Sequence, residues 1–175
     1  MWLSRHLTPL SGSYCDSVME IVRVPYDHPD AITLMDRVQQ IYTERYGGPD
    51  ASPMDPAEFA PPAGEFFLGF LDGAAVATGA WRHVGLDRLG STATAEVKRM
   101  YVVEDMQRRG LARLMLARLE QAAAAAGHDV LVLSTGSMQP EAIALYESSG
   151  YAPVPGWGVY ADHPGAFFFG KAIAS

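Results

Sequence analysis

The stretch "EVKRMYVVEDMQRRGLARLM", Glu96 to Met115, decides the fold because it runs from an expected strand through a short basic loop into an expected helix. Although the chain carries a formal net charge of −7, six of its thirteen basic residues fall between positions 98 and 118. They are Lys98, Arg99, Arg108, Arg109, Arg113 and Arg118. A helix that begins after a Gly-bearing turn presents unpaired backbone N–H groups, which attract anions. The stretch therefore predicts a local anion site.

The loop "QRRGLA", residues 107–112, is suited to a pyrophosphate. Gly110 and Ala112 carry almost no side chain, so a ligand can approach the backbone closely. Arg108, Arg109 and Arg113 can add positive charge to these amides. Two familiar phosphate loops are absent, because there is no GxxxxGK[ST] and no GxGxxG after the first strand. The alternative interpretation is that the arginines only solvate one face of an amphipathic helix.

Working outward from this stretch, alternating and β-branched runs predict strands from Met19, on both sides of the Asp72-Gly73 turn, and over "TATAEVKRMYVV", "DVLVLST" and "GAFFFGKAI". Apolar residues at helical spacing predict helices over 30–46, from about Gly110 to Gly127, and over 138–149. Residues 49–64 hold five of the twelve prolines and predict a loop with room for one short helical turn. This order of elements predicts an α/β (α+β) fold with a mixed sheet and helices on both faces.

Length and composition indicate one domain. With 175 residues, 49% of them hydrophobic, the chain can bury one core, expected over 19–175 after a lead of residues 1–18. The acidic balance argues against nucleic-acid and membrane partners. Cys15 is the one cysteine, so no intrachain disulfide and no Cys/His metal cluster is expected. Without a signal peptide or an apolar run of about 18 residues, the chain is expected to be cytoplasmic.

The loop and its neighbours resemble the GNAT superfamily of acyl-CoA-dependent N-acetyltransferases. The family signature is Gln or Arg, two variable residues, Gly, one variable residue, then Gly or Ala, and residues 107–112 match it. The match follows the strand end "RMYV", precedes a long amphipathic helix, and is followed by a short strand and "AIALYESSGY". The resemblance covers about residues 19–173 and implies a mostly antiparallel twisted sheet of six to seven strands. It also allows a homodimer.

The resemblance implies that acetyl-CoA is the co-substrate, and no metal is expected because the chain cannot assemble a Cys/His cluster. The backbone of Met100, Tyr101 and Val102 would pair with the pantetheine arm. The pyrophosphate would lie on the amides and side chains of residues 107–113, namely Gln107, Arg108, Arg109, Gly110, Leu111, Ala112 and Arg113. Gln139 stands where many members carry an Asn that helps to hold the cofactor arm. Ala112 replaces the second Gly of the signature, which is a permitted variant.

Acetyl transfer to an amine needs a base, a donor to the developing oxyanion and a proton for the leaving thiolate. By resemblance, Tyr146 is the acid, with a core tyrosine as the alternative. Glu96, eleven residues before Gln107, is the candidate base acting through water, although it could instead form a surface pair with Lys98. Strand alternation places Glu96, Lys98, Met100 and Val102 on one face. The oxyanion would meet the Val102 N–H, and His83 is a reserve proton carrier.

The acceptor is expected to be a small-molecule or protein amine. Segments flanking the expected cleft would choose it, and their aromatic and acidic residues could hold a cationic amine or could merely pack the loops. These residues are Trp157, Tyr160, Asp162 and His163, with Glu44, Tyr46 and Asp50 as weaker candidates. The alternative function is an acyl-CoA-binding regulatory module without robust transferase activity. A nucleotide-binding protein of another kind would share the basic loop but leave the later Leu-Tyr helix unexplained.

Overall fold

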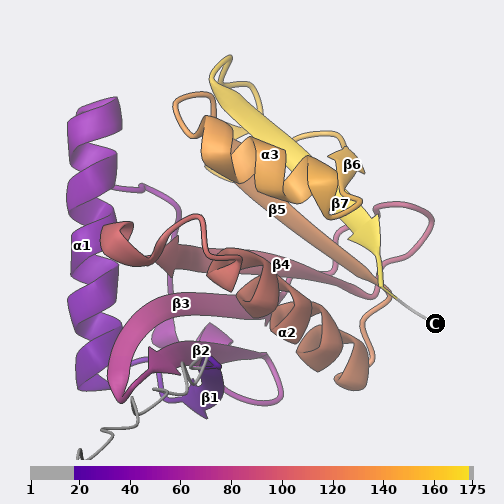
Figure 1. Ribbon diagram of the computed structural model, residues 1–175. Coiled ribbons are helices and arrows are strands. Elements are labelled where there is room, and N and C mark those ends of the chain that lie inside the picture. The colour runs from indigo at the N-terminus through magenta and orange to yellow at the C-terminus, as the bar shows by residue number, and fades with distance from the viewer. Residues whose placement is uncertain (1–17, 174–175) are drawn as a thin grey trace, which may run out of the picture.

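The computed structural model describes residues 18–173. Within these residues, seven strands form one sheet in the order β1-β2-β3-β4-β5-β7-β6 (Figure 1). The strands are β1 Glu20–Val24, β2 Gly64–Leu71, β3 Ala74–His83, β4 Thr94–Val102, β5 Val130–Gly136, β6 Ala152–Pro153 and β7 Ala166–Ala172. Only the β4–β5 pair is parallel. The predicted mixed, mostly antiparallel sheet with helices on both faces is confirmed. Of the predicted lead, residues 1–18, only Val18 is among the described residues. Cys15 lies outside them.

Three α-helices and three short 3₁₀ helices complete the described part of the chain. They are α1 Pro29–Tyr46, α2 Leu111–Ala125, α3 Pro140–Ser148, η1 Pro56–Phe59, η2 Glu104–Met106 and η3 Gly158–Tyr160. Gly47, with φ of 79°, ends α1 in the left-handed conformation that glycine adopts without steric cost. At the predicted hairpin, Asp72 and Gly73 have φ of 50° and 80°, as a type I′ turn requires. The turn chemistry therefore placed β2 and β3 correctly.

The two faces of the sheet bury separate apolar clusters. On one face, Leu34 and Val38 of α1 pack against Phe66 and Leu68 of β2. On the other face, Met115 and Leu119 of α2 belong to a second cluster, which includes Phe67, the residue between Phe66 and Leu68 in β2. Because side chains alternate along a strand, adjacent phenylalanines of β2 serve opposite clusters. Burial on both faces fixes the register of the central strands, since a slip by one residue would exchange the two sets.

Strands β4 and β5 separate soon after they meet. Their parallel pairing covers only Thr94–Glu96 against Val130–Val132. Beyond this point β5 stays paired with β7 up to Gly136, while β4 continues beside β3 to Val102. The ribbon shows the two strands diverging like the arms of a V (Figure 1). The outer half of β4 therefore presents an edge that β5 does not cover.

A β-bulge at Arg99 corrects one expectation about β4. Arg99 has φ of 56°, and the β3–β4 register shifts between Thr78 and Ala80. The extra residue reverses the alternation, so Met100 and Val102 join the cluster on the α2 face while Tyr101 joins the α1 face. The prediction that Glu96, Lys98, Met100 and Val102 share one face is wrong. Lys98 and Met100 lie on opposite faces.

Candidate active site

A cavity of about 320 Å³ opens where β4 and β5 diverge. Residues Val97 to Met100 of β4 form one wall, and Ser134 to Gly136 of β5 form the opposite wall. Tyr42 and Tyr46 of α1 close it on one side, and Ala142 and Tyr146 of α3 lie on the other. The cavity therefore lies at the centre of the sheet, where the unpaired β4 edge is accessible to a ligand.

The N-terminus of α2 lies at the end of the loop that follows β4 and is prepared for an anion. Gly110 precedes the helix with φ of 80°, no side chain caps it, and its first turn contains no acidic residue. By contrast, α1 has a His28 side-chain cap and Asp30 in its first turn. The free N–H groups of α2 and the helix dipole both favour a negatively charged ligand. The anion site at this loop stays a prediction, with which the uncapped start of α2 is compatible.

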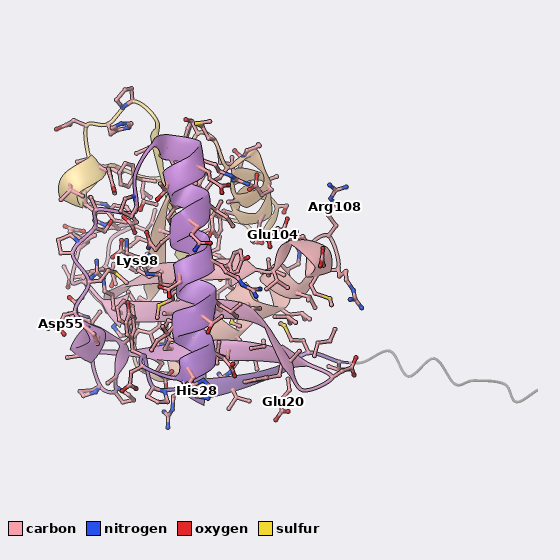
Figure 2. All side chains as sticks on the ribbon, turned by 90° about the vertical axis from the view of Figure 1, so that its left-hand side faces the viewer. Glu20, His28, Asp55, Lys98, Glu104 and Arg108 are labelled. Carbon is pink, nitrogen blue, oxygen red and sulfur yellow. The ribbon has the colours of Figure 1, made fainter. Side chains whose placement is uncertain are left out.

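The three arginines of this loop have different surroundings. Arg108, with φ of 60°, is exposed, and its side chain extends away from the body of the protein (Figure 2). Arg109 is also exposed, and its Nη1 lies 2.8 Å from the Met106 sulfur. Arg113 instead donates to Ser149 Oγ at 3.0 Å and to Ser148 Oγ at 2.8 Å, at the end of α3. Arg108 and Arg109 are accessible to a ligand, whereas the Arg113 guanidinium joins two helices.

Gln107 and the end of β4 form a second feature of the loop. Gln107 Nε2 donates to the Val102 carbonyl at 3.0 Å, and the Val103 N–H donates to Val76 on β3 at 2.9 Å. Because successive residues of a strand direct their N–H groups to opposite edges, the Val102 N–H points toward the side that β5 has left. The Tyr101 side chain faces α1 and donates to Glu104 at 3.0 Å. Only the Tyr101 backbone can therefore contribute to the cavity edge.

Tyr146 lies on α3 with its ring in the core and lines the cavity. Its side chain packs against the rings of Tyr151 and Phe169, with centroids 5.9 and 6.3 Å away. Burial, followed by the neighbouring Tyr42, raises the pKa of the Tyr146 phenol above its ordinary value. The phenol is therefore a neutral hydrogen-bond donor throughout the physiological pH range. Tyr146 is thus a core residue that also lines the cavity, and its role as the acid stays a prediction.

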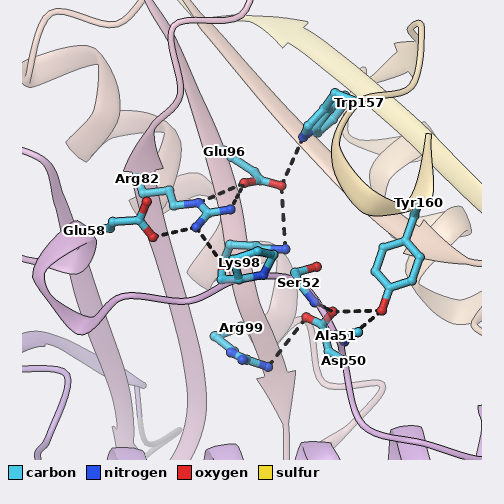
Figure 3. Close-up of polar contacts among 11 residues, drawn as sticks. Asp50, Ala51, Ser52, Glu58, Arg82, Glu96, Lys98, Arg99, Trp157 and Tyr160 are labelled. Atoms are coloured by element: carbon cyan, nitrogen blue, oxygen red, sulfur yellow. Dashed lines mark hydrogen bonds and ion pairs between the residues drawn. The ribbon is translucent and has the colours of Figure 1, made fainter.

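Glu96 lies at the centre of a buried ionic network (Figure 3). Its Oε2 accepts from Arg82 Nε at 2.9 Å and from Arg82 Nη2 at 2.8 Å. Its Oε1 accepts from Trp157 Nε1 at 3.3 Å and lies 3.6 Å from Lys98 Nζ. Burial would lower the pKa of Arg82, but Glu96 and then Glu58 outweigh burial and raise it. Glu96 is thus paired with Arg82 and, at a longer distance, with Lys98. The Glu96–Lys98 pair that was the alternative to a catalytic role is present, but it is buried and does not lie on the surface.

Two cations of β4 line the cavity on the α1 side of the sheet, Lys98 and Arg99. The side chain of each is only 10% exposed. Lys98 is seen inside the body of the protein beside α1, well separated from Arg108 at the periphery (Figure 2). Burial alone would raise the pKa of Asp50, but Lys98, hydrogen bonds from Ser52 and then Arg99 hold it below its ordinary value. Asp50 is therefore ionised opposite these cations.

The expected acceptor residues divide between the cavity and its surroundings. Tyr46, Asp50, Tyr160 and His163 line the cavity. The Tyr160 hydroxyl lies 3.3 Å from Asp50 Oδ1, and Gln139 reaches the cavity and donates to the Tyr46 hydroxyl at 3.3 Å. Trp157 donates to Glu96 and packs edge-to-face on Phe168, while Glu44 and Asp162 are not among the lining residues. Sequence analysis did not place Lys98, Arg99 or Tyr42 among the residues that could hold the acceptor. For Arg99 the reason is that the bulge which turns it into the cavity has no local signature in the sequence.

Two further observations concern the described residues alone. Within residues 18–173, no group of three or more His, Cys, Asp or Glu side chains is placed to hold a metal ion. No helix in that part of the chain is long and apolar enough to span a membrane. His83, the reserve proton carrier, lies away from the cavity, with its Nδ1 3.1 Å from His128 Nε2.

Comparisons with known proteins agree with this geometry. The model of the "Acetyltransferase (GNAT) family" matches residues 35–151. An "IAA acetyltransferase" of Azospirillum brasilense is 30% identical over 142 residues, covering 81% of this chain and 90% of that protein. A Klebsiella pneumoniae structure assigned as an acyl-CoA N-acyltransferase has a TM-score of 0.72 at 24% identity, covering 89% and 97% of the two chains. A Salmonella typhimurium structure containing its cofactor acetyl-CoA has a TM-score of 0.62 at 20% identity, covering 91% and 96%. At these identities the two structures support the fold.

Proposed function

The chain belongs to the GNAT family of acetyltransferases, and from that premise we propose that it transfers the acetyl group of acetyl-CoA to a primary amine by direct attack in a ternary complex. The observation that carries this proposal is the cavity between β4 and β5, which Tyr146 lines from one side and buried charged residues line from the other. Such an arrangement can hold two reactants in contact, which converts a bimolecular step into a nearly unimolecular one.

The fit to acetyl-CoA rests on two unpaired sets of backbone groups. The N-terminus of α2 has no side-chain cap and no acidic residue, so it can receive the pyrophosphate together with Gly110, Leu111 and Ala112. The β4 edge from Met100 to Val102 has no β5 partner and, apart from the Val102 carbonyl that accepts from Gln107, can pair with the amide groups of the pantetheine arm. Arg108 and Arg109 are the proposed charged contacts. Arg113 contributes its backbone N–H, since its side chain bonds to Ser148 and Ser149. Gln139 lies at the cavity and is a proposed contact for the arm.

Acetyl-CoA supplies an activated acetyl group as a thioester. In the transfer a C–N bond forms, the C–S bond breaks, the amine gives up one proton and the sulfur takes one. We assign the donor at the sulfur to Tyr146. Its raised pKa makes it a weak acid toward a thiolate in water, but burial also raises the basicity of a thiolate, so donor and acceptor shift together. The Val102 N–H is the proposed donor to the carbonyl oxygen.

We propose Glu96 as the base, with the proton passing through water. Its two oxygens differ: Oε2 is held by the short Arg82 contacts, and Oε1 has only the longer contacts to Trp157 and Lys98. Oε1 is therefore the oxygen at which a water from the cavity can replace a weaker partner. Lys98 lines the cavity directly and marks the route from the cavity to Glu96.

Two measurements test the function. Calorimetry with acetyl-CoA asks whether the protein binds the donor, and a thiol-release assay over a broad panel of amines asks whether it transfers. Binding together with amine-dependent thiol release supports the transferase. Binding without release for any amine would favour the alternative function, an acyl-CoA-binding regulatory module. Failure to bind acetyl-CoA would contradict both.

The remaining expectations follow as proposals. We place the protein in the cytoplasm as a single domain over residues 19–175, acting on a small-molecule or protein amine. It would act without a metal, a nucleic-acid partner or a membrane, and a homodimer is compatible with the fold. The net charge of −7 supports the absence of nucleic-acid and anionic-membrane partners, because it opposes binding to polyanions.

A further inference from the structure

Resting on the proposed function, we infer that the acceptor is a small amine that also carries a single carboxylate, such as a free amino acid, and that Arg99 binds this carboxylate. The inference narrows the acceptor from any primary amine to one chemical class. It also gives the cavity a different character from the cation-binding pocket that its aromatic and acidic residues suggested.

Arg99 is a buried cation with unused hydrogen-bonding capacity. Its side chain is 10% exposed, and its Nε and Nη1 atoms have no hydrogen-bond partner among the described residues. The nearest carboxylate oxygen, Asp50 Oδ2, lies 3.8 Å from Nη1, beyond hydrogen-bonding distance. A buried charged donor without a partner costs more free energy than an exposed one, and that cost is recovered when an anion fills the position.

The position of Arg99 is held by the backbone. Arg99 occupies the bulge with φ of 56°, and Thr78 Oγ1 donates to its carbonyl at 2.7 Å. Thr78 is fully buried, so this anchor is rigid. An arginine in the left-handed conformation is uncommon, and the surrounding structure has to maintain it. The bulge therefore turns the side chain of Arg99 toward Asp50 and the cavity and away from its place in regular alternation.

Arg99 does not lie where the phosphates of acetyl-CoA are proposed to bind. Lys98 and Arg99 reach the cavity from the α1 side, where they meet Asp50 and Glu96. The anion loop follows the C-terminal end of β4, and there Arg108 extends from the periphery, well separated from Lys98 (Figure 2). The basic residues of this stretch thus lie at two different sites. Arg108 and Arg109 lie at the anion loop, whereas Lys98 and Arg99 on β4 are available to the acceptor.

The charge balance favours one carboxylate over a phosphate. Lys98 is matched by Glu96 and Arg99 by Asp50, while Arg82 is matched by Glu58 (Figure 3). A dianion would leave the buried network with excess negative charge, whereas an amino acid adds one carboxylate and one amine. The planar guanidinium also suits a carboxylate. The cavity of about 320 Å³, which Tyr42, Tyr46 and Tyr160 help to line, has room for an amino acid with a small side chain. The acetyl end of the donor occupies part of the same volume.

The test compares matched pairs of acceptors on the unmodified protein. L-amino acids and their carboxamides are assayed for thiol release with acetyl-CoA, beside polyamines that carry no carboxylate. We expect kcat/KM for the best amino acid to exceed that for its carboxamide by about 100-fold, because a site with a dedicated donor rejects an analogue that cannot use it. Equal kcat/KM for the amino acid and its carboxamide, or activity with polyamines alone, would overturn the inference. Neither result would contradict the proposed transferase function.

Variants of Arg99 provide the second arm. Arg99→Met should raise KM for the amino acid by about 10- to 100-fold and reduce the advantage of the amino acid over its carboxamide by a similar factor. Arg99→Lys should recover part of the loss. The control is Arg23→Met, which removes an exposed ion pair to Glu65 on β1 and β2 and should change neither substrate. A KM that does not respond to Arg99→Met would overturn the inference.

A binding measurement separates this inference from the proposed function. N-acetylglycine and N-acetylglycinamide are titrated into the protein saturated with CoA. We expect the acid to bind more tightly and Arg99→Met to abolish the difference. If acetyl-CoA binds but neither compound distinguishes Arg99 from Met, the inference fails alone. If Arg99→Met does not fold, Arg99→Lys and the acid–carboxamide comparison on the unmodified protein still decide it.

Discussion

Arg82 holds Glu96 through two hydrogen bonds to a single oxygen, with Nε and Nη2 at 2.9 and 2.8 Å from Oε2. The same arginine donates from Nη1 to the carbonyl of Pro53 at 3.1 Å and to Glu58 at 2.6 Å. Arg82 therefore joins the β4 strand to the proline-rich loop that covers the cavity. Glu96 has a structural task in addition to the proposed catalytic one, and the two tasks can be separated experimentally.

Replacing Glu96 by Gln should lower kcat by about 100-fold, the lower end of what a general base contributes, while the KM for acetyl-CoA stays within about twofold. The matched control is Glu58→Gln, because Glu58 is the other carboxylate on Arg82 but, unlike Glu96, is not paired with the cavity residue Lys98. Thermal unfolding of both variants is measured beside the kinetics. If both variants lose stability and neither loses kcat, Glu96 is only an anchor.

Replacing Arg108 or Arg109 by Ala should weaken acetyl-CoA binding by about 3- to 10-fold each at low ionic strength and less at high salt, because exposed charges are screened. Arg113→Ala should instead destabilise the contact between α2 and α3, since it removes the bonds to Ser148 and Ser149. Arg118 on α2 lies over the Phe67 ring at 4.8 Å, and Arg118→Ala is the control for a general loss of charge. If all four variants bind acetyl-CoA with equal affinity, the loop arginines only solvate one face of the helix.

The stability of the protein should fall as the pH drops below about 6.5, because of His128. Burial and then His83 lower the pKa of His128 below its ordinary value of 6.5, although the Ala123 carbonyl opposes this. The unfolded chain thus binds more protons than the folded one in this range, and stability rises with pH. The contribution is fully present above 6.5 and is lost as the pH falls toward the folded pKa. Urea unfolding at pH 7.5 and 5.5 measures the slope.

His128→Asn should flatten that slope, whereas His163→Asn, at an exposed histidine, should leave it unchanged. An equally steep loss of stability in His128→Asn would show that other groups cause the acid sensitivity.

Alanine at Gly79 should destabilise the protein by about 1–3 kcal/mol, the usual cost of overpacking a core. Gly79 lies in β3 opposite the bulge, where an added methyl group would stand 2.7 Å from Met115 Cγ and 3.1 Å from Leu119 Cδ1. Alanine at Gly48, which has open space around it, is the control. Equal unfolding midpoints in urea for the two variants would mean that α2 shifts without cost.

The sequence predicted the elements well because each is punctuated by local chemistry. The Asp72-Gly73 turn, Gly47 after α1 and the loop before α2 mark the boundaries that the structure has. The bulge at Arg99 was not predictable, since it is imposed by the pairing of β3 with β4 across Gly79 and by the Thr78 hydrogen bond. Arg82 was missed for the same reason, because its partners come from the proline-rich loop and from β4, which are far apart in the sequence. Contacts between distant segments decide which charges enter the cavity, and no spacing along the chain reveals them.

The central claim is that Tyr146 assists acetyl transfer in the cavity, and the measurement that tests it most directly compares Tyr146→Phe with the unmodified protein at saturating acetyl-CoA. The assay is amine-dependent thiol release, with acetyl-CoA affinity measured on the same samples. Tyr151→Phe is the matched control, because Tyr151 is also buried and packs on Tyr146 without lining the cavity. We predict a fall in kcat of about 100-fold for Tyr146→Phe, an unchanged acetyl-CoA affinity, and little change for Tyr151→Phe. An unchanged kcat for Tyr146→Phe would contradict the account.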